Sequence, residues 1–494
     1  MDAHETPQSI PQPSTNTSSF CKSFSIYILP ILILIIAVTF TSIKSDNYQI
    51  QFHVNPTVKF LWKNLILKYN KYDQSNVMQT NKIDPAYCVL WMAPFLSGGG
   101  YSSEAWSYIT SIRENVKNPS FRLRIEQHGD MESVDFWEGL PEYMRKMALD
   151  LHQTQCRMNE TIVVCHSEPG AWYPPLFDTF PCPPSSRYKD FLAVIGRTMF
   201  ETDRVNVEHV RRCNRMDFVW VPTEFHVSSF IQSGVESSKI VKVVQPVDVD
   251  FFDAREYQSL DLAHVRRLVL GKGVKSSLSS DDEFVFLSIF KWEYRKGWDV
   301  LLKAYLTEFC RTDSVTLYLL TNPYHTDVNF SNKIIEFVED SDLIRPVSGW
   351  ASVYVIDTHI AQVDLPRLYK SANAFVLPSR GEGWGRPLVE AMSMSLPVIA
   401  TNWSGPTEYL TDENSYLIPV DRMSEVTEGP FKGHLWAEPS VQKLQGLMRH
   451  VMNNPEEARE KGKRAREDMI SKFSPNSVAG IVNKLVNTIL HERA

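Results

Sequence analysis

Short apolar runs alternate with amphipathic stretches from Tyr87 to the C-terminus. Apolar runs of strand length, separated by helical stretches, are typical of a parallel sheet covered by helices on both faces. In the first part of this region the pattern predicts six strands, at Tyr87–Pro94, Phe121–Glu126, Thr161–Cys165, Phe191–Ile195, Phe218–Val221 and Ile240–Val244.

The alternation lapses after Pro246, in a polar stretch from Asp253 to Asp282, and then resumes. Five further strands are predicted, at Phe284–Phe290, Val315–Leu320, Ala374–Pro378, Leu396–Ala400 and Ser415–Pro419. The fold class is therefore α/β, with two Rossmann-like domains that we place at residues 85–250 and 251–474. The alternating charges of Pro455–Lys472 predict a solvated helix face.

One apolar segment near the N-terminus is longer than any predicted strand. Ile26–Phe40 is almost continuously apolar and lies in a stretch of 21 residues without a formal charge, just long enough to cross a bilayer. We interpret residues 24–43 as a transmembrane signal anchor between a polar tail (1–23) and a stem (44–84). A buried core helix and a cleaved signal peptide are the alternatives.

This layout predicts a single-pass type II protein of the Golgi or endoplasmic reticulum with its catalytic domains in the lumen. Lys22 and Lys44 flank the segment almost symmetrically, so the positive-inside rule does not fix the orientation. In the lumen, the sequons at Asn159 and Asn329 would be glycosylated, while Asn402 lies beside the candidate site and is expected to stay bare.

The composition narrows the class of protein further. Of the 494 residues, 43% are hydrophobic and 22% are charged, which excludes a disordered or fibrous chain. The net charge of −7 leaves no cationic excess for nucleic acid, so no nucleic-acid partner is expected. The seven cysteines include no C-x-x-C pair, so neither a zinc site nor a dense disulfide framework is indicated, and the odd count leaves at least one thiol unpaired.

The most informative motif follows the predicted strand Ala374–Pro378. It reads SRGEGWGRPLVEAMS, with Glu382 and Glu390 eight residues apart and a helix predicted at Arg386–Met394. The loop glycines would let a ligand approach the backbone, and the helix N-terminus offers N–H groups to an anion. Glu382 could accept hydrogen bonds from sugar hydroxyls, and Glu390 from a ribose diol. The motif also comes close to the dinucleotide fingerprint but has Arg386 in place of the third glycine.

A cationic turn follows the predicted strand Phe284–Phe290. In FKWEYRKGWDVLL, Lys291, Arg295 and Lys296 surround the start of the next helix and should face the same sheet edge as Glu382. Such cations can hold a diphosphate without a metal ion. Taken alone, such a cluster is more often a solvated turn.

The first domain offers two further strand ends. The glycines Gly98, Gly99 and Gly100 follow its opening strand and could admit a phosphate or a sugar, although an ordinary tight turn is the alternative. His166 follows the strand Thr161–Cys165. A single histidine there is usually structural, and only its coincidence with the other strand ends makes it a site candidate.

These segments resemble a known family. SRGEGWGRPLVEAMSMSLPVIATNWSGPTEYL, with FKWEYRKGWDVLLKAY, the His-x-Glu-Pro segment and VVQPVDVDFFDA, is similar to the retaining GT-B glycosyltransferases of family 4, the glycogen-synthase-like group. The resemblance covers roughly residues 86–490 and is most specific from Arg380 to Leu410. It implies two facing Rossmann domains, a nucleotide-sugar donor held mainly by the second, and retained anomeric configuration without a divalent metal.

The resemblance also implies residue roles. Glu382 would contact the donor sugar and Glu390 the ribose, while Lys291 and Lys296 would hold the diphosphate. Lys291 replaces the more usual arginine, which keeps the charge but loses the two-pronged geometry. By the same resemblance Gly98–Gly100 would form the family's glycine loop, His166 would lie beside the donor sugar, and the segment 475–494 would cross back onto the first domain. The remaining predicted binding residues are Arg295, Gly381, Gly383, Trp384, Gly385, Arg386, Pro387 and Leu388.

The sequence thus predicts a metal-independent retaining glycosyltransferase that moves a hexose from a nucleotide-diphosphate sugar to a glycan, lipid or protein, with no cofactor beyond the donor. Asp248 and Asp250 suggest the divalent-ion motif of another glycosyltransferase fold, but they lie in the interdomain linker, where a structural cap is expected. Two alternatives stay open. One is a non-catalytic sugar-binding or scaffolding protein on this fold; the other is a nicotinamide oxidoreductase, which would need an intact fingerprint after the first strand.

Overall fold

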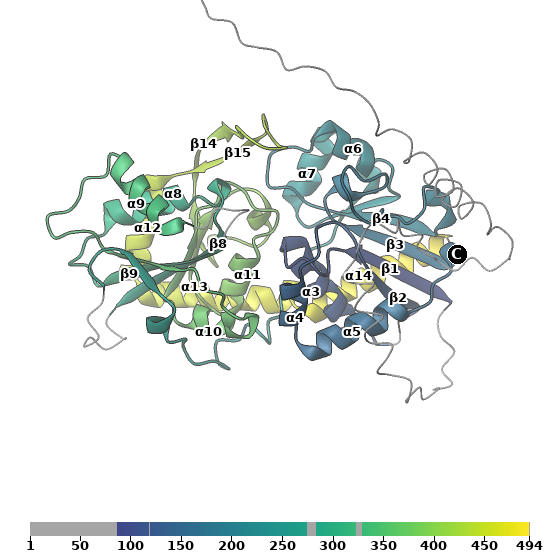
Figure 1. Cartoon of the computed structure of the whole chain (residues 1–494), viewed down its shortest axis with the longest axis horizontal. Coiled ribbons are helices and arrows are strands. Elements are labelled where there is room, and N and C mark those ends of the chain that lie inside the picture. Colours follow the sequence, from purple (N-terminus) through teal and green to yellow (C-terminus); the bar gives the residue numbers. More distant parts are fainter. Residues whose placement is uncertain (1–85, 118, 274–282, 323–328, 494) are drawn as a thin grey trace, which may run out of the picture. The chain divides into compact units, whose positions relative to one another are not determined.

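Two largely parallel sheets form the framework of the chain (Figure 1). The computed structural model describes residues 86–493 except 118, 274–282 and 323–328. The predicted tail, anchor and stem lie outside the described residues. Within the described ranges, no helix is both long enough and apolar enough to cross a membrane.

The first sheet has six strands, all parallel. In spatial order they are β2 (Phe121–Gln127), β1 (Tyr87–Ala93), β3 (Thr161–His166), β4 (Ala193–Arg197), β5 (Phe218–Val221) and β6 (Ile240–Lys242). The β3 run TIVVCH is buried along its whole length, as expected for a strand covered on both faces. The helices of this half are α3 (Gly100–Asn115), α4 (Val134–Gly139), α5 (Glu142–Gln153), α6 (Val207–Cys213) and α7 (Glu224–Ser233).

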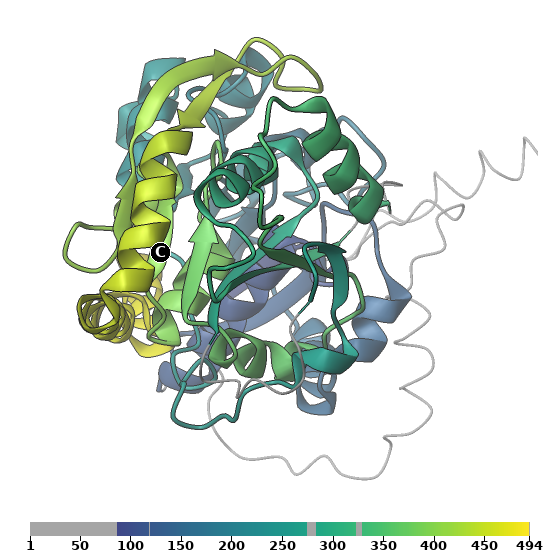
Figure 2. The same cartoon turned by 90° about the vertical axis from the view of Figure 1, so that its left-hand side faces the viewer.

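The second sheet has seven strands, and Figure 2 views the molecule from the side of this half. In spatial order they are β13 (Tyr416–Ile418), β12 (Val398–Thr401), β11 (Ala374–Leu377), β8 (Phe284–Lys291), β9 (Val315–Asn322), β10 (Ser352–Ile356) and β7 (Arg267–Leu270). Its helices are α8 (Trp298–Glu308), α9 (Phe330–Asp340), α10 (Leu365–Lys370), α11 (Arg386–Ser393), α12 (Val441–Asn453) and α13 (Pro455–Asp468). Both sheets belong to one compact unit.

Four strands were absent from the sequence prediction. β7 lies within the polar stretch 253–282 and pairs antiparallel with β10 at the sheet edge, where none of its residues is fully buried. β14 (Val420–Glu425) and β15 (Leu435–Pro439) form a separate antiparallel hairpin whose exposed positions are polar except for Met423. Edge strands with little burial leave a weak apolar signal. β10 carries a clear β-branched run that the prediction missed.

Helix starts in the first half follow the usual capping chemistry. The side chains of Ser133, Asn206 and Thr223 accept hydrogen bonds from backbone N–H groups in the first turns of α4, α6 and α7. Each cap satisfies a donor that the helix itself leaves free. The helix α11 has Gly385 at this position and no side-chain cap.

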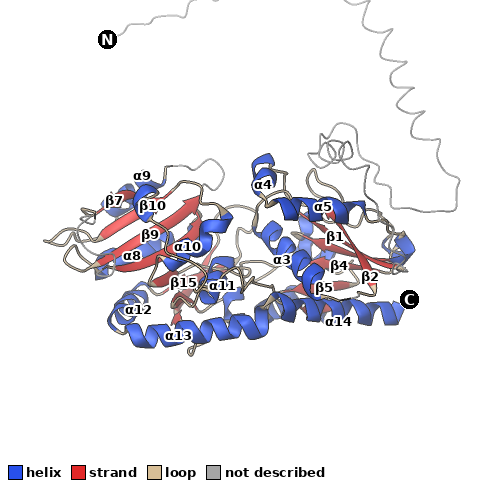
Figure 3. Ribbon diagram, turned by 90° about the horizontal axis from the view of Figure 1, so that it is seen from below, coloured by secondary structure: helices blue, strands red, loops and turns tan. Residues whose placement is uncertain are grey.

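The C-terminal helix α14 (Pro475–Arg493) leaves the second half and packs against α3 of the first, as the resemblance implied (Figure 3). Ser120 donates a hydrogen bond to Asn487, and Arg493 forms a 2.8 Å ion pair with Asp217. The preceding helix α13 buries only its small residues, including Ala458 and Ala465. The predicted solvated charged face of this helix is therefore confirmed.

Two disulfides stabilise the first half. They join Cys88 to Cys156 and Cys165 to Cys182. Sequence spacing predicted no pairing, because the partners lie on elements that only the fold brings together. Within the described ranges the remaining cysteines, Cys213 and Cys310, are free thiols.

Candidate active site

The glycine-rich motif lies where β11 ends and α11 begins. Gly385 adopts φ +86°, and a Cβ there would stand 2.9 Å from Leu388 Cδ1, so glycine suits this turn on both grounds. No side chain caps α11, Pro387 has no N–H, and the N–H groups of Leu388 and Val389 donate to the carbonyl oxygen of Gly385. The positive end of the helix dipole still faces the loop. This arrangement suits an anionic ligand.

Glu382 is buried in this loop beside two cations. Lys296 Nζ lies 2.7 Å and 2.8 Å from its two carboxylate oxygens, and Arg295 Nη1 lies 3.4 Å from Oε2. Burial raises the pKa of the Glu382 carboxyl, but the attraction of Lys296 and Arg295 outweighs it and holds the pKa below its usual value. The carboxylate is therefore ionised, and two of the three cations expected at this sheet edge, Lys296 and Arg295, lie beside Glu382.

The cationic turn is packed tightly against the loop. Gly297 adopts φ +69°, and a Cβ there would lie 1.9 Å from the carbonyl oxygen of Pro378. Arg295 donates from Nη1 to the carbonyl oxygen of Gly381 at 2.7 Å, and the N–H of Arg380 donates to the carbonyl oxygen of Arg295 at 2.7 Å. These contacts fix Lys296 beside Glu382.

Glu390 lies on the first turns of α11 and is mostly buried. The hydroxyl of Tyr369 donates to its Oε2 at 2.9 Å, while Arg386 Nε stands 3.8 Å from Oε1. Burial raises the pKa of Glu390, against the opposing effects of Arg386 and Tyr369. The Nε and Nη1 atoms of Arg386 are buried and have no hydrogen-bond partner among the described residues, so this guanidinium could still bind an anion.

Lys291 differs from the other predicted cations. It stands at the end of β8, its side chain is exposed, and it interacts electrostatically with Asp130 of the first half. No hydrogen bond or ion pair within the described part of the chain joins it to Glu382. It is therefore held less firmly than Lys296.

His166 is enclosed in the first half. The Nε1–H group of Trp91 donates to its Nδ1 at 3.0 Å, and its Nε2 lies 3.0 Å from Glu104 Oε2. Glu104 is in turn held by Arg197 through Nε at 2.8 Å and through Nη2. Burial lowers the pKa of His166 despite the opposing effect of Glu104, so the ring is neutral with its proton on Nε2.

Both ring nitrogens of His166 are thus engaged within the protein, and its side chain is 0% exposed. Both nitrogens thus face partners within the first half, and a role of His166 beside the donor sugar stays a prediction. What the sequence missed is the pair of buried partners, Trp91 and Glu104, which lie 75 and 62 residues before His166.

Packing explains two of the three glycines in the turn of the first half. Gly98 adopts φ +71°, and a Cβ there would lie 2.7 Å from Phe136 Cδ2. A Cβ on Gly99 would lie 3.3 Å from an Asp130 oxygen, while Gly100 has open space around it. Only Gly100 therefore lacks a packing reason to be glycine.

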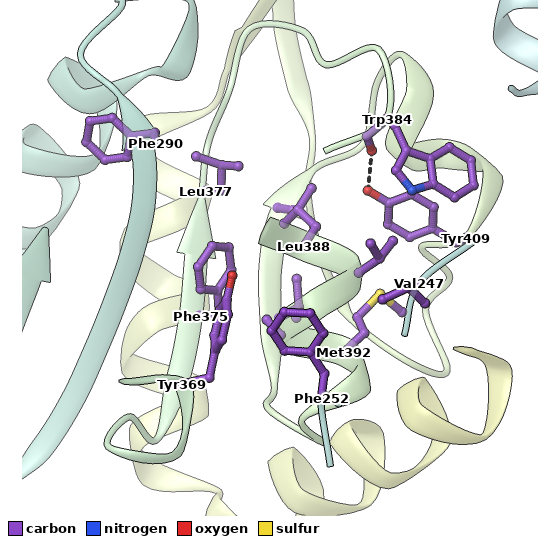
Figure 4. Packing of buried hydrophobic residues seen from close by; sticks show 14 of the residues in the cluster. Val247, Phe252, Phe290, Tyr369, Phe375, Leu377, Trp384, Leu388, Met392 and Tyr409 are labelled. Carbon is purple, nitrogen blue, oxygen red and sulfur yellow. Dashed lines mark hydrogen bonds between the residues drawn. The ribbon is translucent and has the colours of Figure 1, made fainter. Parts of the chain in front are cut away.

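Two predicted binding residues are core residues instead (Figure 4). Trp384 is 2% exposed and packs against Tyr409 and Phe473, and the Tyr409 hydroxyl donates to the Trp384 carbonyl. Leu388 is fully buried, and its N–H donates to the carbonyl oxygen of Gly385. These two side chains stabilise the loop and the start of α11, and binding of a ligand at these positions stays a prediction.

Other residues at the site were missed. Ser404 follows β12, adopts φ +63°, and its Oγ accepts a hydrogen bond from the N–H of Glu382 at 2.9 Å. Its position after a strand in N-W-S-G-P was a usable signal. Tyr369, on α10, had none, because only the fold brings it to Glu390.

The linker acidic pair is also explained. Asp248 Oδ1 accepts a hydrogen bond from the N–H of Phe251 at 2.9 Å, so it caps a turn as predicted. Within the ranges that the structure describes, no cluster of three or more His, Cys, Asp or Glu side chains is arranged to hold a metal ion.

Comparison with known proteins agrees with this geometry. Residues 281–429 match the family described as "Glycosyl transferases group 1". The chain is 40% identical over 63 residues to O-antigen chain mannosyltransferase B of Escherichia coli, covering 13% of this chain and 16% of the relative. It is 25% identical over 235 residues to the capsular polysaccharide biosynthesis glycosyltransferase CapM of Staphylococcus aureus, covering 47% of each. The chain thus spans less than half the length of these curated relatives.

The fold has solved counterparts. The structure of Anabaena HepE in complex with UDP and glucose superposes with a TM-score of 0.56 at 12% identity, covering 81% of this chain and 100% of that one. At such identity the likeness shows the fold alone. The described chain therefore has an α/β, GT-B-like glycosyltransferase fold with parallel sheets, as predicted.

Proposed function

We propose that the protein is a metal-independent retaining glycosyltransferase of family 4, which moves a hexose from a nucleotide-diphosphate sugar to a glycan, lipid or protein acceptor. The observation that carries this proposal is the buried, ionised Glu382 held by Lys296 and Arg295 at the start of an uncapped helix. One sheet edge thus offers acceptors for sugar hydroxyls and cations for a leaving diphosphate.

The chemistry would follow from these charges. Breaking the bond between sugar and diphosphate places negative charge on the leaving group, which Lys296, Arg386 and the α11 N-terminus would stabilise. Since Lys296 already pairs with Glu382, an arriving diphosphate would share this cation, and Glu382 would turn toward the sugar. Glu390 would accept hydrogen bonds from the ribose hydroxyls, with Tyr369 holding its other oxygen.

The similar proteins support a nucleotide-sugar donor and a glycan acceptor. HepE was solved with UDP and glucose, and two relatives carry names of mannosyl transfer and capsular polysaccharide synthesis. We therefore expect either a UDP- or a GDP-linked hexose as donor, without a further cofactor.

Donor hydrolysis tests the proposal directly. The full chain, purified in detergent, is incubated with UDP- and GDP-hexoses, with and without EDTA, and the released nucleotide and the anomer of the sugar are measured. We expect release from one donor with the same anomer and no loss with EDTA. Activity that EDTA abolishes and manganese restores would refute metal independence, and failure of every donor would favour a non-catalytic sugar-binding protein.

We also propose that residues 24–43 anchor the protein and that its catalytic domains are lumenal. The disulfides of the first half favour an oxidising compartment, and the sequon residues Asn159 and Asn329 are exposed. Sealed microsomes should protect the large domain from protease, and an endoglycosidase should increase its mobility on a gel. Digestion of that domain would reverse the orientation.

A further inference from the structure

A short segment of the first half reaches the glycine loop of the second. We name residues 198–203, which follow β4, the arm. The hydroxyl of Tyr101, at the start of α3, donates to the carbonyl oxygen of Met199 at 3.0 Å and lies 3.1 Å from Thr198 Oγ1. Arg197, which precedes the arm, is locked by Glu104. The base of the arm is therefore rigidly held.

The arm occupies the space that two loop glycines leave open. A Cβ on Gly381 would lie 2.0 Å from the carbonyl oxygen of Glu201, and a Cβ on Gly383 would lie 2.8 Å from Met199 Sδ. Arg295, which also contacts Glu382, lies 3.7 Å from Glu201 Oε1. The sequence predicted that these glycines contact a ligand, but in the structure the arm lies against them.

The tip of the arm is bonded to the β14–β15 hairpin. The N–H of Asp203 donates to the carbonyl oxygen of Leu435 at 2.9 Å, and the N–H of Leu435 donates to Asp203 Oδ1 at 2.7 Å. Next to this pair, Thr202 Oγ1 lies 2.9 Å from His434 Nδ1. We name the two hydrogen bonds between Asp203 and Leu435 the latch.

The same hairpin strand is tied to the candidate site. The N–H of Ala437 donates to the carbonyl oxygen of Arg380 at 2.9 Å, and Arg380 Nε donates to Glu438 Oε1 at 3.0 Å. Arg380 stands two residues before Glu382. The latch and the site are therefore connected through β15, and the arm packs on the glycine loop between them.

We propose that Asp203 is a positioning residue for transfer: by latching the arm to β15 it holds Met199 and Glu201 against the glycine loop and so fixes Glu382. This inference rests on the proposed function. Asp203 touches no donor-binding residue, so loss of the latch should reduce turnover far more than donor affinity. Small misplacements of reacting groups can cost up to about 100-fold in rate.

The first experiment compares three variants of the full chain. Asp203→Ala removes the acceptor for the Leu435 N–H and should lower kcat about tenfold or more, with donor KM changed less than about threefold. Asp203→Asn keeps an oxygen acceptor at that position and should restore most of kcat. Asp217→Ala is the matched control. Asp217 accepts a 2.8 Å hydrogen bond from the Val194 N–H and lies away from the glycine loop, so the kcat of this variant should stay near wild type.

Equal kcat for Asp203→Ala and the wild-type protein would overturn the proposal, and so would a failure of Asp203→Asn to recover activity. A drop in Asp217→Ala as large as in Asp203→Ala would show that both act only through stability, which would also overturn it.

The second experiment tests whether contact with the arm is the reason that position 383 is a glycine. Gly383→Ala should lower both thermal stability and kcat, because its methyl group meets Met199 Sδ. In the Met199→Ala background the same change should cost much less, because the obstacle is gone. Equal cost in both backgrounds would refute docking of the arm. The stability half of this cycle needs no turnover, so it remains decisive even if no donor is ever hydrolysed.

Discussion

The carboxyl edges of the two sheets hold similar residue types in opposite states. At the first edge, His166, Glu104 and Arg197 are at most 1% exposed and bind one another. At the second, the side chains of Lys296, Arg386 and Glu390 remain 13% to 19% exposed, and two guanidinium nitrogens of Arg386 lack a partner within the described ranges. The charged groups of the first edge are enclosed by one another, whereas those of the second remain partly exposed and can meet a ligand.

The difference extends to the rest of each half. Both disulfides of the described residues lie in the first half, and the segment matched by the family model, 281–429, lies in the second. The family signal thus falls on the half whose polar groups are still available. A polar cluster at a strand end becomes a candidate site only when its hydrogen-bonding capacity is unfilled.

Removing the buried carboxylate of the first edge should have the largest effect on stability. Glu104→Ala leaves Arg197 buried without its partner and should lower the free energy of unfolding by about 3–5 kcal/mol. Glu308→Ala is the matched control, because its 2.7 Å pair with Arg449 is partly exposed and should be worth about 1 kcal/mol or less. Urea unfolding measures both. Equal losses would mean that the first edge is not specially stabilised.

The same network predicts acid sensitivity. Burial raises the pKa of Glu104, but Arg197 and His166 outweigh it and lower the pKa to about 2. A carboxyl with a depressed folded-state pKa stabilises the fold above its unfolded pKa of about 4.5, and that contribution is lost as the pH falls from there toward 2. The stability gap between wild type and Glu104→Gln should therefore narrow between pH 5 and pH 2. A gap independent of pH would contradict this assignment.

At the second edge, the largest effect should be on turnover. Lys296→Met removes both contacts to Glu382 and a cation from the proposed diphosphate site, and should lower kcat by about 100- to 1,000-fold. Lys303, exposed on helix α8, which follows the turn that carries Lys296, supplies the control, and Lys303→Met should stay within about twofold. Initial rates of donor hydrolysis, measured for both variants, test this prediction. A Lys296→Met enzyme of normal rate would remove this cation from the mechanism.

The sequence predicted the framework well for a physical reason. Fully buried parallel strands such as β11, and β3 between Thr161 and His166, form continuous apolar runs, so they are visible without the fold. The meeting of Lys296 with Glu382 was also predictable, since strands β8 and β11 of one parallel sheet end at one edge.

Contacts between distant segments were not predictable. The partners of His166, the tyrosine that binds Glu390 and the two disulfides depend on which residues face each other across the fold. Gly381 and Gly383 illustrate the point: the sequence shows that something approaches them closely, but only the structure shows that it is the arm.

The two glutamates of the second edge should differ in their effects on nucleotide binding and on turnover. Glu390→Gln replaces a charged acceptor and should weaken nucleoside diphosphate binding by about 1–3 kcal/mol, roughly 5- to 150-fold. Glu382→Gln frees Lys296 from its counter-charge, so diphosphate affinity should be kept while turnover falls. Calorimetry, beside transfer rates and melting temperatures, checks both. The same effect of the two changes on nucleotide affinity would refute this division of roles.

The smallest effect should come from Lys291, which tests how far the cationic site extends. Because this side chain is exposed and makes no ion pair within the described ranges, its contribution to diphosphate affinity should be about 1 kcal/mol or less, or fivefold at most. Lys291→Ala should lose even this effect at high salt, since screening acts on exposed charges first. Lys303→Ala, equally exposed on α8, should change nothing. If Lys291→Ala instead matches the loss in Lys296→Met and resists salt, the ligand must bury Lys291 on binding, and the open edge would then extend toward the first half through Asp130.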